Sequence, residues 1–314
     1  MTNIINEHEI CVVALKRSGH HAIVQWLYAN VDGGYLFLNQ CSPAANPFDL
    51  KHIVKKPEKR FITNIDGLDA QTACTGVHVP KQALIYNYEH MSLDQITAPV
   101  GEGQHERWVG ASKRRTHILA LRDPFNNLAS LLKVYYAGTK YSVRLLRRSV
   151  ELWKQYAREA LGQTQLLSHR LLIDYNRWFT DVSYKTGLAQ QLGLSGAGAG
   201  LQEVAKWGST SSFDGTRLDG QAAQMKVLER WRHFVDDPLY LRLIRDEELW
   251  DLCEQIHGLP DGVEQLRSDR MAAPELPSTR WLPSTLLGKQ RQLSSRWQYW
   301  RAPKPDADLV PPAS

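Results

Sequence analysis

Residues 11–27 read CVVALKRSGHHAIVQWL, an apolar strand that passes through a basic, glycine-containing turn directly into an amphipathic helix. In open α/β sheets such a turn binds phosphate, because backbone N–H groups and the positive end of the helix meet there. Gly19 permits the tight turn, Ser18 and Gly19 supply N–H groups, and Lys16 and Arg17 add positive charge. The stretch therefore predicts a parallel sheet with an anion site after its first strand.

The alternation of strand and helix continues along the chain. Apolar segments typical of strands buried on both faces lie at 9–15, 35–38, 83–88, 117–121 and 170–174. Amphipathic segments typical of helices lie at 20–30, 124–137, 143–160, 178–192, 221–236 and 246–257. This order predicts an α/β fold in which a doubly wound parallel sheet is flanked by helices.

The length and the composition fit one large α/β domain or two small ones. The chain has 314 residues, of which 43% are hydrophobic and 23% charged, enough for a sizeable core. We expect a single α/β domain over 1–270. The remainder, 271–314, is basic and rich in Trp and Pro, and we expect it to be partly disordered, with a helix between Ser284 and Arg301.

The charge and the cysteines exclude several classes of protein. The net charge of +5 fits a local site for an anionic ligand and argues against a nucleic-acid-binding surface. The N-terminus lacks the lysines of a signal peptide and no apolar run is long enough to span a membrane, so we expect a cytoplasmic protein. The four cysteines show no metal-ligand spacing, so neither a disulfide framework nor a metal site is predicted. The oligomeric state is left open.

The first loop departs from two common nucleotide-binding patterns. A Walker A loop carries a Lys and a Ser or Thr after its last glycine, to reach the phosphates and Mg²⁺, but His20 and His21 follow Gly19 here. The GxGxxG pattern of dinucleotide-binding folds is also absent. The loop thus argues against a Mg–ATP site and a dinucleotide site, and an incidental strand–turn–helix connection remains an alternative.

A second strand–loop–helix segment supports the anion-site interpretation. Residues 117–133 read HILALRDPFNNLASLLK, in which Arg122 ends the strand and Pro124 suits a first helical turn. Ser130 follows Arg122 by eight residues. A planar guanidinium can bind a phosphate through two hydrogen bonds, and a hydroxyl can donate a third. The alternative is that Arg122 pairs with an acid or caps a helix.

The two segments together resemble the sulfotransferase superfamily, whose members use 3′-phosphoadenosine 5′-phosphosulfate (PAPS). The family's first loop is a [KR]-S-G-T-T sequence between strand and helix; Arg17, Ser18 and Gly19 match it, and two histidines replace the hydroxyl residues. The resemblance implies a 5′-phosphosulfate site formed by Lys16, Arg17, Ser18, Gly19, His20, His21 and Ala22. The family's 3′-phosphate motif is matched by Arg122, Asp123, Pro124 and Ser130.

Two later segments resemble the family less closely. In 171–181, Tyr175 matches an aromatic residue near the adenine, whereas Asn176 replaces an acid; Tyr175 could equally be a core residue. Residues 207–220 resemble the loop that closes over the 3′-phosphate, which implies anion donors at Arg217, Ser211 and Ser212. A solvated surface loop is the alternative reading of this second segment.

The resemblance implies in-line transfer of the sulfuryl group of PAPS to a hydroxyl or amine of a small-molecule metabolite or saccharide. The products are the sulfated acceptor and 3′,5′-bisphosphate adenosine (PAP), and the transfer requires no metal. Arg17 would neutralise the leaving oxygen, since its guanidinium stays charged. A P-loop-like nucleotide kinase and a non-catalytic nucleotide-binding protein remain the alternatives.

A general base should lie within hydrogen-bond reach of the acceptor. Glu89 is the first candidate, because it ends the strand ALIYNYEH and strand ends face the cleft in open α/β folds. His21 and His90 are the others. The alternative for Glu89 and His90 is a solvated turn before a helix, because the sequence predicts a capping box between Ser92 and Gln95.

Overall fold

The computed structural model describes residues 3–49, 57–76, 78–101, 103–138, 141–200 and 211–272. All of these belong to one compact unit, Met1–Pro274. The helix predicted between Ser284 and Arg301, and nearly all of the predicted C-terminal extension, lie outside the described residues. No helix within the described ranges combines the length and the hydropathy needed to cross a membrane.

Six strands form one sheet in the order β3-β2-β4-β1-β5-β6. Their bounds are β1 Ile4–Ala14, β2 Tyr35–Leu38, β3 Phe61–Thr63, β4 Lys81–Glu89, β5 Ala111–Leu121 and β6 Arg170–Asp174. Neighbouring strands are parallel except β2 and β3, which pair antiparallel. Because Ala14 pairs with both Glu89 and Ala120, the carboxyl ends of β1, β4 and β5 meet at one edge. The predicted sites after β1, β4 and β5 therefore share this edge.

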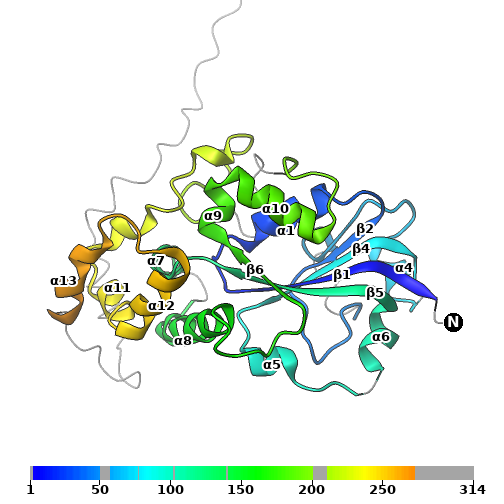
Figure 1. Ribbon diagram of the computed structural model, residues 1–314, viewed down its shortest axis with the longest axis horizontal. Helices are drawn as coiled ribbons and strands as arrows, with labels where there is room; N and C mark the ends of the chain where they lie inside the picture. The colour runs from blue at the N-terminus through cyan, green and yellow to red at the C-terminus, as the bar shows by residue number, and fades with distance from the viewer. Residues whose placement is uncertain are drawn as a thin grey trace, which may run out of the picture. The chain divides into compact units, whose positions relative to one another are not determined.

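Helices cover both faces of the sheet (Figure 1). Helices α1 (His20–Ala29), α9 (Tyr175–Thr180) and α10 (Val182–Leu192) lie over one face, and α5 (Leu93–Thr97), α6 (Gln104–Val109) and α8 (Val143–Ala160) lie over the other. The short helices are α3 (Pro57–Arg60), α4 (Ala70–Ala73), η1 (Ala222–Gln224), η2 (Arg230–Phe234) and η3 (Val263–Gln265). The mixed α/β fold with a mostly parallel, doubly wound sheet is confirmed.

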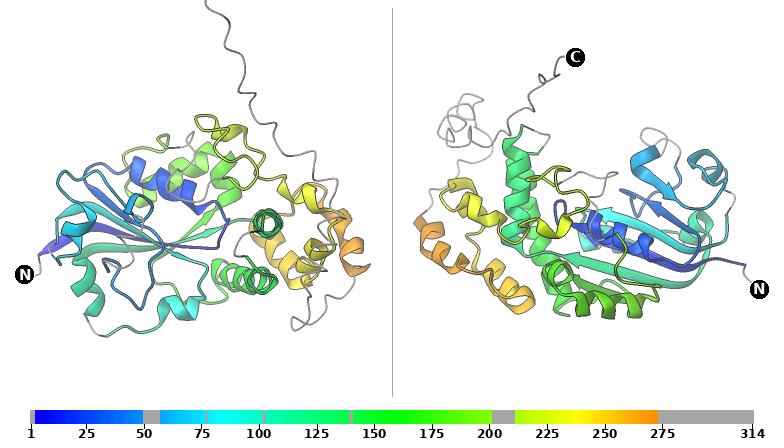
Figure 2. Two further views of the ribbon diagram at one scale, coloured as in Figure 1. Left: turned by 180° about the vertical axis from the view of Figure 1, so that it is seen from behind. Right: turned by 90° about the horizontal axis from the view of Figure 1, so that it is seen from above.

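The remaining helices extend the molecule beyond the end of the sheet (Figure 2). These are α7 (Pro124–Tyr136), α11 (Pro238–Leu243), α12 (Glu247–His257) and α13 (Leu266–Ala272). Helix α11 contacts α7, α8 and α13, and α12 contacts α8. Side chains of β1 and α1, among them Val12, Val24 and Trp26, form the core of one face and are fully buried.

Two of the predicted helices are wrong, and one strand was missed. The helix expected over 221–236 is replaced by η1 and η2, and within η2 the N–H of Trp231 donates to the side-chain oxygen of Asn126. The helix expected over 178–192 is interrupted at Asp181, whose carboxylate accepts from the N–H of Tyr184 and caps α10. The edge strand β3 was not expected at all.

Candidate functional site

The turn between β1 and α1 is closed by Ser18. Both its N–H and its hydroxyl donate to the carbonyl oxygen of Leu15, at 3.3 and 2.8 Å. Arg17 and Gly19 have φ angles of 62° and 86°, so the loop uses the left-handed region twice within three residues. The Ser18 side chain is therefore committed to holding the turn, and N–H groups at the start of α1 remain as donors for an anion.

Tyr175 lies directly against Gly19. A Cβ atom at position 19 would lie 2.2 Å from Cε2 of the tyrosine ring. The ring is 5% exposed, stacks on Trp178 with centroids 5.8 Å apart, and has the Arg122 guanidinium carbon 5.3 Å from its centroid. Tyr175 is thus part of the hydrophobic core and supports the backbone of the first loop.

We expect Gly19→Ala to lower the free energy of unfolding by about 3 kcal/mol, because it adds a strained φ to an overpacked contact. This loss corresponds to a melting temperature lower by roughly 6–12 °C. Gly67→Ala is the matched control: Gly67 also has a positive φ, of 74°, but nothing lies within 4 Å of its would-be Cβ. Equal melting temperatures for the two variants would contradict the proposed role of the Tyr175 contact.

The second predicted segment places Arg122 beside the first loop. Arg122 is 1% exposed, and its Nη1 donates to the Ser130 hydroxyl and to the Arg17 carbonyl, each at 3.3 Å. Its Nη2 donates to the carbonyl of Val227, while the Trp153 indole donates to the Arg122 carbonyl at 2.8 Å. The structure therefore brings Arg122 and Ser130 together beside the β1–α1 turn.

A further arginine, Arg230, reaches the same serine and was missed by the sequence analysis. Its side chain is 8% exposed; Nη1 donates to the Ser130 hydroxyl at 3.2 Å and Nη2 to the Ser211 hydroxyl at 3.0 Å. Ser130 thus accepts from two arginines. The sequence carries little signal for its burial, because the apolar Val227, Leu228 and Trp231 alternate with the charged residues 226, 229 and 232.

The other residues expected in this closing loop lie differently. Arg217 has a side chain that is 74% exposed, and it forms an ion pair with Asp214 at 3.8 Å. The structure does not bring it to Ser130. Ser211 also donates to Asp214, at 2.9 Å, and the Ser212 hydroxyl is buried without a hydrogen-bond partner in the described part of the chain. Residues 207–210 of the expected loop lie outside the described residues.

Three arginines give this region a strongly positive character. Burial lowers the pKa of Arg122 and Arg17, and the charge of Arg122 lowers that of Arg17 further. Burial, and then Arg122, lower the pKa of Arg230 to about 9. Asp214 offsets part of this charge, from 3.6 Å. Because buried like charges are unfavourable together, the cluster of Arg17, Arg122 and Arg230 is suited to an anion that neutralises it.

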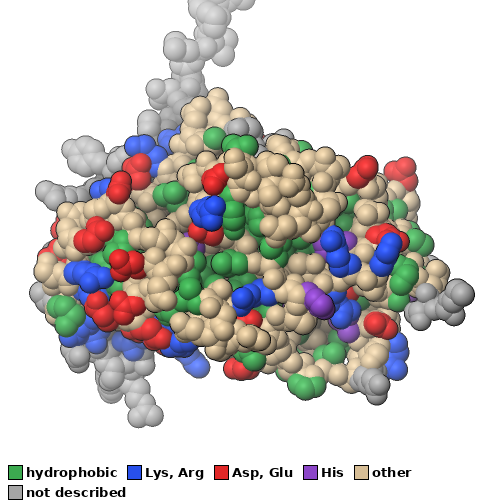
Figure 3. All heavy atoms as spheres, in the orientation of Figure 1, with side chains coloured by type: hydrophobic (Ala, Val, Ile, Leu, Met, Phe, Trp, Pro, Cys, Tyr) green, Lys and Arg blue, Asp and Glu red, His purple; other side chains and the backbone are tan. Residues whose placement is uncertain are grey.

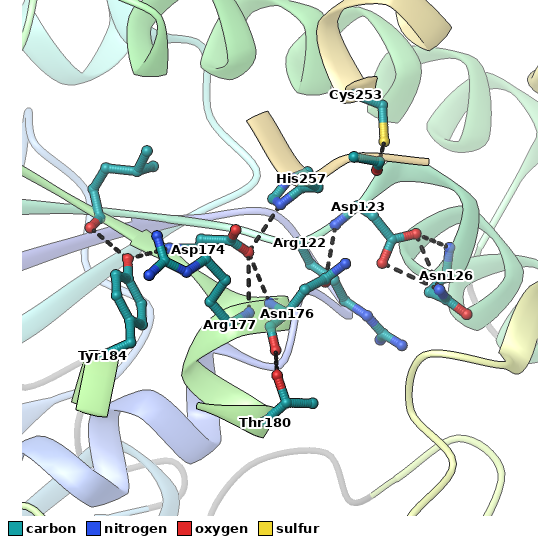
Figure 4. Close-up of polar contacts among 12 residues, drawn as sticks. Arg122, Asp123, Asn126, Asp174, Asn176, Arg177, Thr180, Tyr184, Cys253 and His257 are labelled. Atoms are coloured by element: carbon teal, nitrogen blue, oxygen red, sulfur yellow. Dashed lines mark hydrogen bonds and ion pairs between the residues drawn. The ribbon is translucent and has the colours of Figure 1, made fainter. Parts of the chain in front are cut away.

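The start of α7 connects the cluster to its surroundings (Figure 4). Asp123 caps the helix by accepting from the Asn126 N–H at 2.8 Å, and its own N–H donates to the Asn176 side chain at 3.4 Å. The Asn126 amide donates to the Leu228 carbonyl at 3.0 Å. The Asn127 amide donates to the Lys16 carbonyl at 2.9 Å. One helical turn therefore holds the first loop and the 227–231 segment at the same time.

Glu89, His20 and His21 gather on the other side of the first loop. Glu89 ends β4 with a side chain 11% exposed, and its Oε1 lies 3.7 Å from Nε2 of His20. The His20 and His21 rings meet edge to face, with centroids 4.2 Å apart. Burial, followed by the charge of Arg17, lowers the pKa of His20 to about 3, so this imidazole is neutral near pH 7. The predicted site residues Glu89 and His21 are thus brought together.

The turn after Glu89 is only partly solvated. The predicted capping box between Ser92 and Gln95 is confirmed, with the Gln95 N–H donating to the Ser92 hydroxyl at 3.2 Å. His90 is nevertheless half-buried, and burial, then Lys16 and Arg148, lower its pKa to about 4. Lys16 itself extends over the Tyr141 ring, 5.8 Å from the centroid.

A cavity of about 60 Å³ lies beyond the end of β2. It is lined by apolar side chains, including Leu38 and Pro47, and by the polar residues Asn39, Gln40 and Arg60. The Gln40 amide donates to Oε2 of Glu89 at 3.4 Å, and Arg60 donates to the Gln40 oxygen at 3.3 Å. A chain of polar contacts therefore links this cavity to the Glu89 carboxylate.

No protein-family model and no curated protein matches the chain. Solved structures that are similar to it include three sulfotransferases. The sulfotransferase domain of the olefin synthase of Synechococcus PCC 7002 is 11% identical, with a TM-score of 0.40, over 92% of this chain and 95% of that one. A mouse sulfotransferase complexed with PAP is 13% identical, with a TM-score of 0.43, over 83% and 90%. The sulfotransferase domain from the curacin biosynthetic pathway is 12% identical, with a TM-score of 0.37, over 90% and 96%. The chain is thus distantly similar in structure to solved sulfotransferases.

Proposed function

We propose that the chain binds PAPS and transfers its sulfuryl group to a hydroxyl or amine of a small-molecule metabolite or saccharide. The observation that carries the proposal is the pair of buried arginines, Arg122 and Arg230, that meet at Ser130 beside the β1–α1 turn. Together with that turn they provide two anion sites, as an adenosine phosphorylated on both its 3′ and 5′ sides requires. Mg–ATP carries its phosphates in a single chain and calls for a Lys and a hydroxyl that this loop lacks.

Each part of the site has a distinct task in this proposal. The N–H groups of 19–21, Lys16 and Arg17 bind the 5′-phosphosulfate, and Arg122, Ser130 and Arg230 bind the 3′-phosphate, with Ser211 and Ser212 as further donors. Arg17 neutralises the charge that develops on the leaving oxygen, as preorganised cations do in phosphoryl transfer. Arg230 replaces Arg217 in this assignment, because Arg217 is exposed and does not reach Ser130.

Glu89 is the proposed base and takes the proton of the acceptor. The bond between sulfur and the acceptor oxygen or nitrogen forms as the bond between sulfur and the 5′-phosphate oxygen breaks, and PAP leaves. His20 stays neutral beside the carboxylate, and His21 is the alternative base. The cavity connected to Glu89 through Gln40 is the proposed entry for the acceptor. Its lining mixes apolar and polar side chains, and its volume of about 60 Å³ accommodates the reacting end of a hydroxylated or amine-bearing acceptor rather than the whole molecule.

Nucleic acid is not a proposed partner. The face drawn in Figure 3 carries acidic and basic side chains side by side, rather than a continuous basic surface. The arginines that form the anion site are buried or half-buried, which suits a small ligand that can enter between the loops.

A second candidate function is nucleotide binding without transfer. It is favoured by His20, which occupies the place of a hydroxyl residue but directs its ring nitrogens toward Ser18, at 3.4 Å, and Glu89. Saturable binding of PAPS with no transfer to any acceptor would support this function over the first.

Thermal denaturation with PAP, AMP and Mg–ATP at matched concentrations tests the proposal. PAP at about a hundred times its dissociation constant adds roughly 2.7 kcal/mol to the free energy of unfolding. We expect the melting temperature to rise by several degrees with PAP, less with AMP, and little with Mg–ATP. A rise with Mg–ATP alone would favour a kinase, and no rise with any nucleotide would overturn both nucleotide functions.

A further inference from the structure

Three side chains with metal-binding atoms face one another where β4 ends and α1 begins. One ligand atom from each of His20, His21 and Glu89 lies within 4.8 Å of the other two. The distance between His20 Nε2 and Glu89 Oε1 is 3.7 Å. With metal–ligand bonds of about 2.0–2.2 Å, ligands around a tetrahedral ion lie roughly 3.3–3.6 Å apart. A small closure of these side chains would therefore place all three on one ion.

His20 supplies the independent observation that a ligand is expected here. Its side chain is 98% buried, and among the residues that the structure describes its Nε2 has no hydrogen-bond partner, although it lies 3.7 Å from Oε1 of Glu89. Buried polar atoms are almost always satisfied by a partner, so an orphaned imidazole nitrogen needs an explanation. The other ring nitrogen lies 3.4 Å from the Ser18 hydroxyl, the kind of contact that orients a ligating histidine.

We propose that His20, His21 and Glu89 bind a divalent transition-metal ion of the Zn²⁺ class. Two imidazoles and one carboxylate suit Zn²⁺ and Co²⁺, whereas Mg²⁺ and Ca²⁺ require a shell of oxygen ligands. Three protein ligands leave a fourth position for water or an anionic oxygen. The Arg17 guanidinium, close enough to lower the pKa of His20, opposes a cation here, so the ion binds reversibly rather than as a permanent structural element.

An occupied metal site would act on the proposed transfer as an inhibitor. Glu89 cannot coordinate an ion and accept a proton from the acceptor at the same time. This consequence rests on the proposed function, but binding of the metal does not. The experiment therefore measures binding in the absence of nucleotide, so that a failure of either proposal can be recognised separately.

Titration of the tag-free full chain with Co²⁺, followed by visible absorption, tests the site. We expect one equivalent to bind with the d–d bands of a four-coordinate ion, and Zn²⁺ to displace it, while excess Mg²⁺ does not. Glu89→Gln and His21→Asn should each weaken binding on the order of 100-fold, since loss even of residues behind the ligands costs 10–100-fold. His90→Asn is the matched control, because His90 follows Glu89 directly but does not belong to the group of His20, His21 and Glu89.

Two results would overturn the metal site. One is the absence of saturable Co²⁺ bands in the unmodified chain. The other is binding that Glu89→Gln and His21→Asn leave unchanged, which would assign the bands to other histidines. Circular dichroism of each variant shows whether it is folded. X-ray absorption of the Zn²⁺-loaded unmodified chain, which requires no variant, should report two imidazole nitrogens, and any other number contradicts the assignment.

Discussion

Arg230→Met is expected to weaken PAP binding by about 10–100-fold and to leave AMP binding within a factor of about three. Arg230 is almost fully buried and directs two N–H groups at the Ser130 and Ser211 hydroxyls. Charge-assisted hydrogen bonds to a phosphate are worth about 1.5–3 kcal/mol, and methionine keeps most of the side-chain volume without the charge. Because AMP lacks the 3′-phosphate, its affinity reports on everything else in the site.

Arg217→Met is the matched control for this experiment. It also removes one positive charge. The Arg217 side chain, however, is 74% exposed and forms an ion pair with Asp214 rather than a hydrogen bond with Ser130. Isothermal titration of both variants with PAP and AMP separates the two arginines. Equal losses of PAP affinity in the two variants, or a parallel loss of AMP affinity in Arg230→Met, would contradict a specific 3′-phosphate site.

Arg17→Met should lower kcat for sulfuryl transfer by about 10²–10³-fold while PAP affinity falls much less. A preorganised charge at the leaving oxygen acts mainly on the transition state, where negative charge develops. Arg17 has a φ of 62°, and methionine carries the same backbone cost, so the substitution tests the guanidinium and not the turn. Arg17→Lys should recover part of the rate, because it restores the charge without the planar fork.

Single-turnover rates at saturating PAPS measure this effect apart from binding. A variant that binds PAPS poorly but transfers at the normal rate once saturated would show that Arg17 only binds the ground state. Circular dichroism and the melting temperature of the ligand-free variant exclude misfolding as the cause.

The fold was predictable because its signals are local. Residues 10–14 of β1, 83–88 of β4 and 118–121 of β5 are mainly apolar runs that are buried, and the loops after β1 and β5 carry their polar residues at the strand ends. The eight-residue spacing between Arg122 and Ser130 places both on one short strand–helix connection. Strand β3 has only three residues and pairs antiparallel at the edge, so periodicity gives little signal for it.

The part of the site that escaped prediction depends on contacts between distant segments. Arg230 meets Ser130 across 100 residues, and Asn126 meets Leu228 across 102. Arg230 and Arg217 carry the same charge, so the local sequence does not show that the first is buried and the second exposed. The approach of His20 to Glu89 likewise follows from the parallel register that sets the end of β1 beside the end of β4, which no single segment encodes.

The first turn of α7 sets the distance between the two sides of the candidate site, the first loop and the 227–231 segment. Asn126 and Asn127 are neighbours in the chain, yet one holds the 227–231 segment and the other holds the backbone of Lys16. Because both asparagine side chains project from one turn of helix, this rigid element sets the separation between the two groups of proposed anion donors. Such a site selects ligands by the distance between their negative charges. An analogue that carries both charges at a longer or shorter separation should bind only one of the two groups of donors at a time.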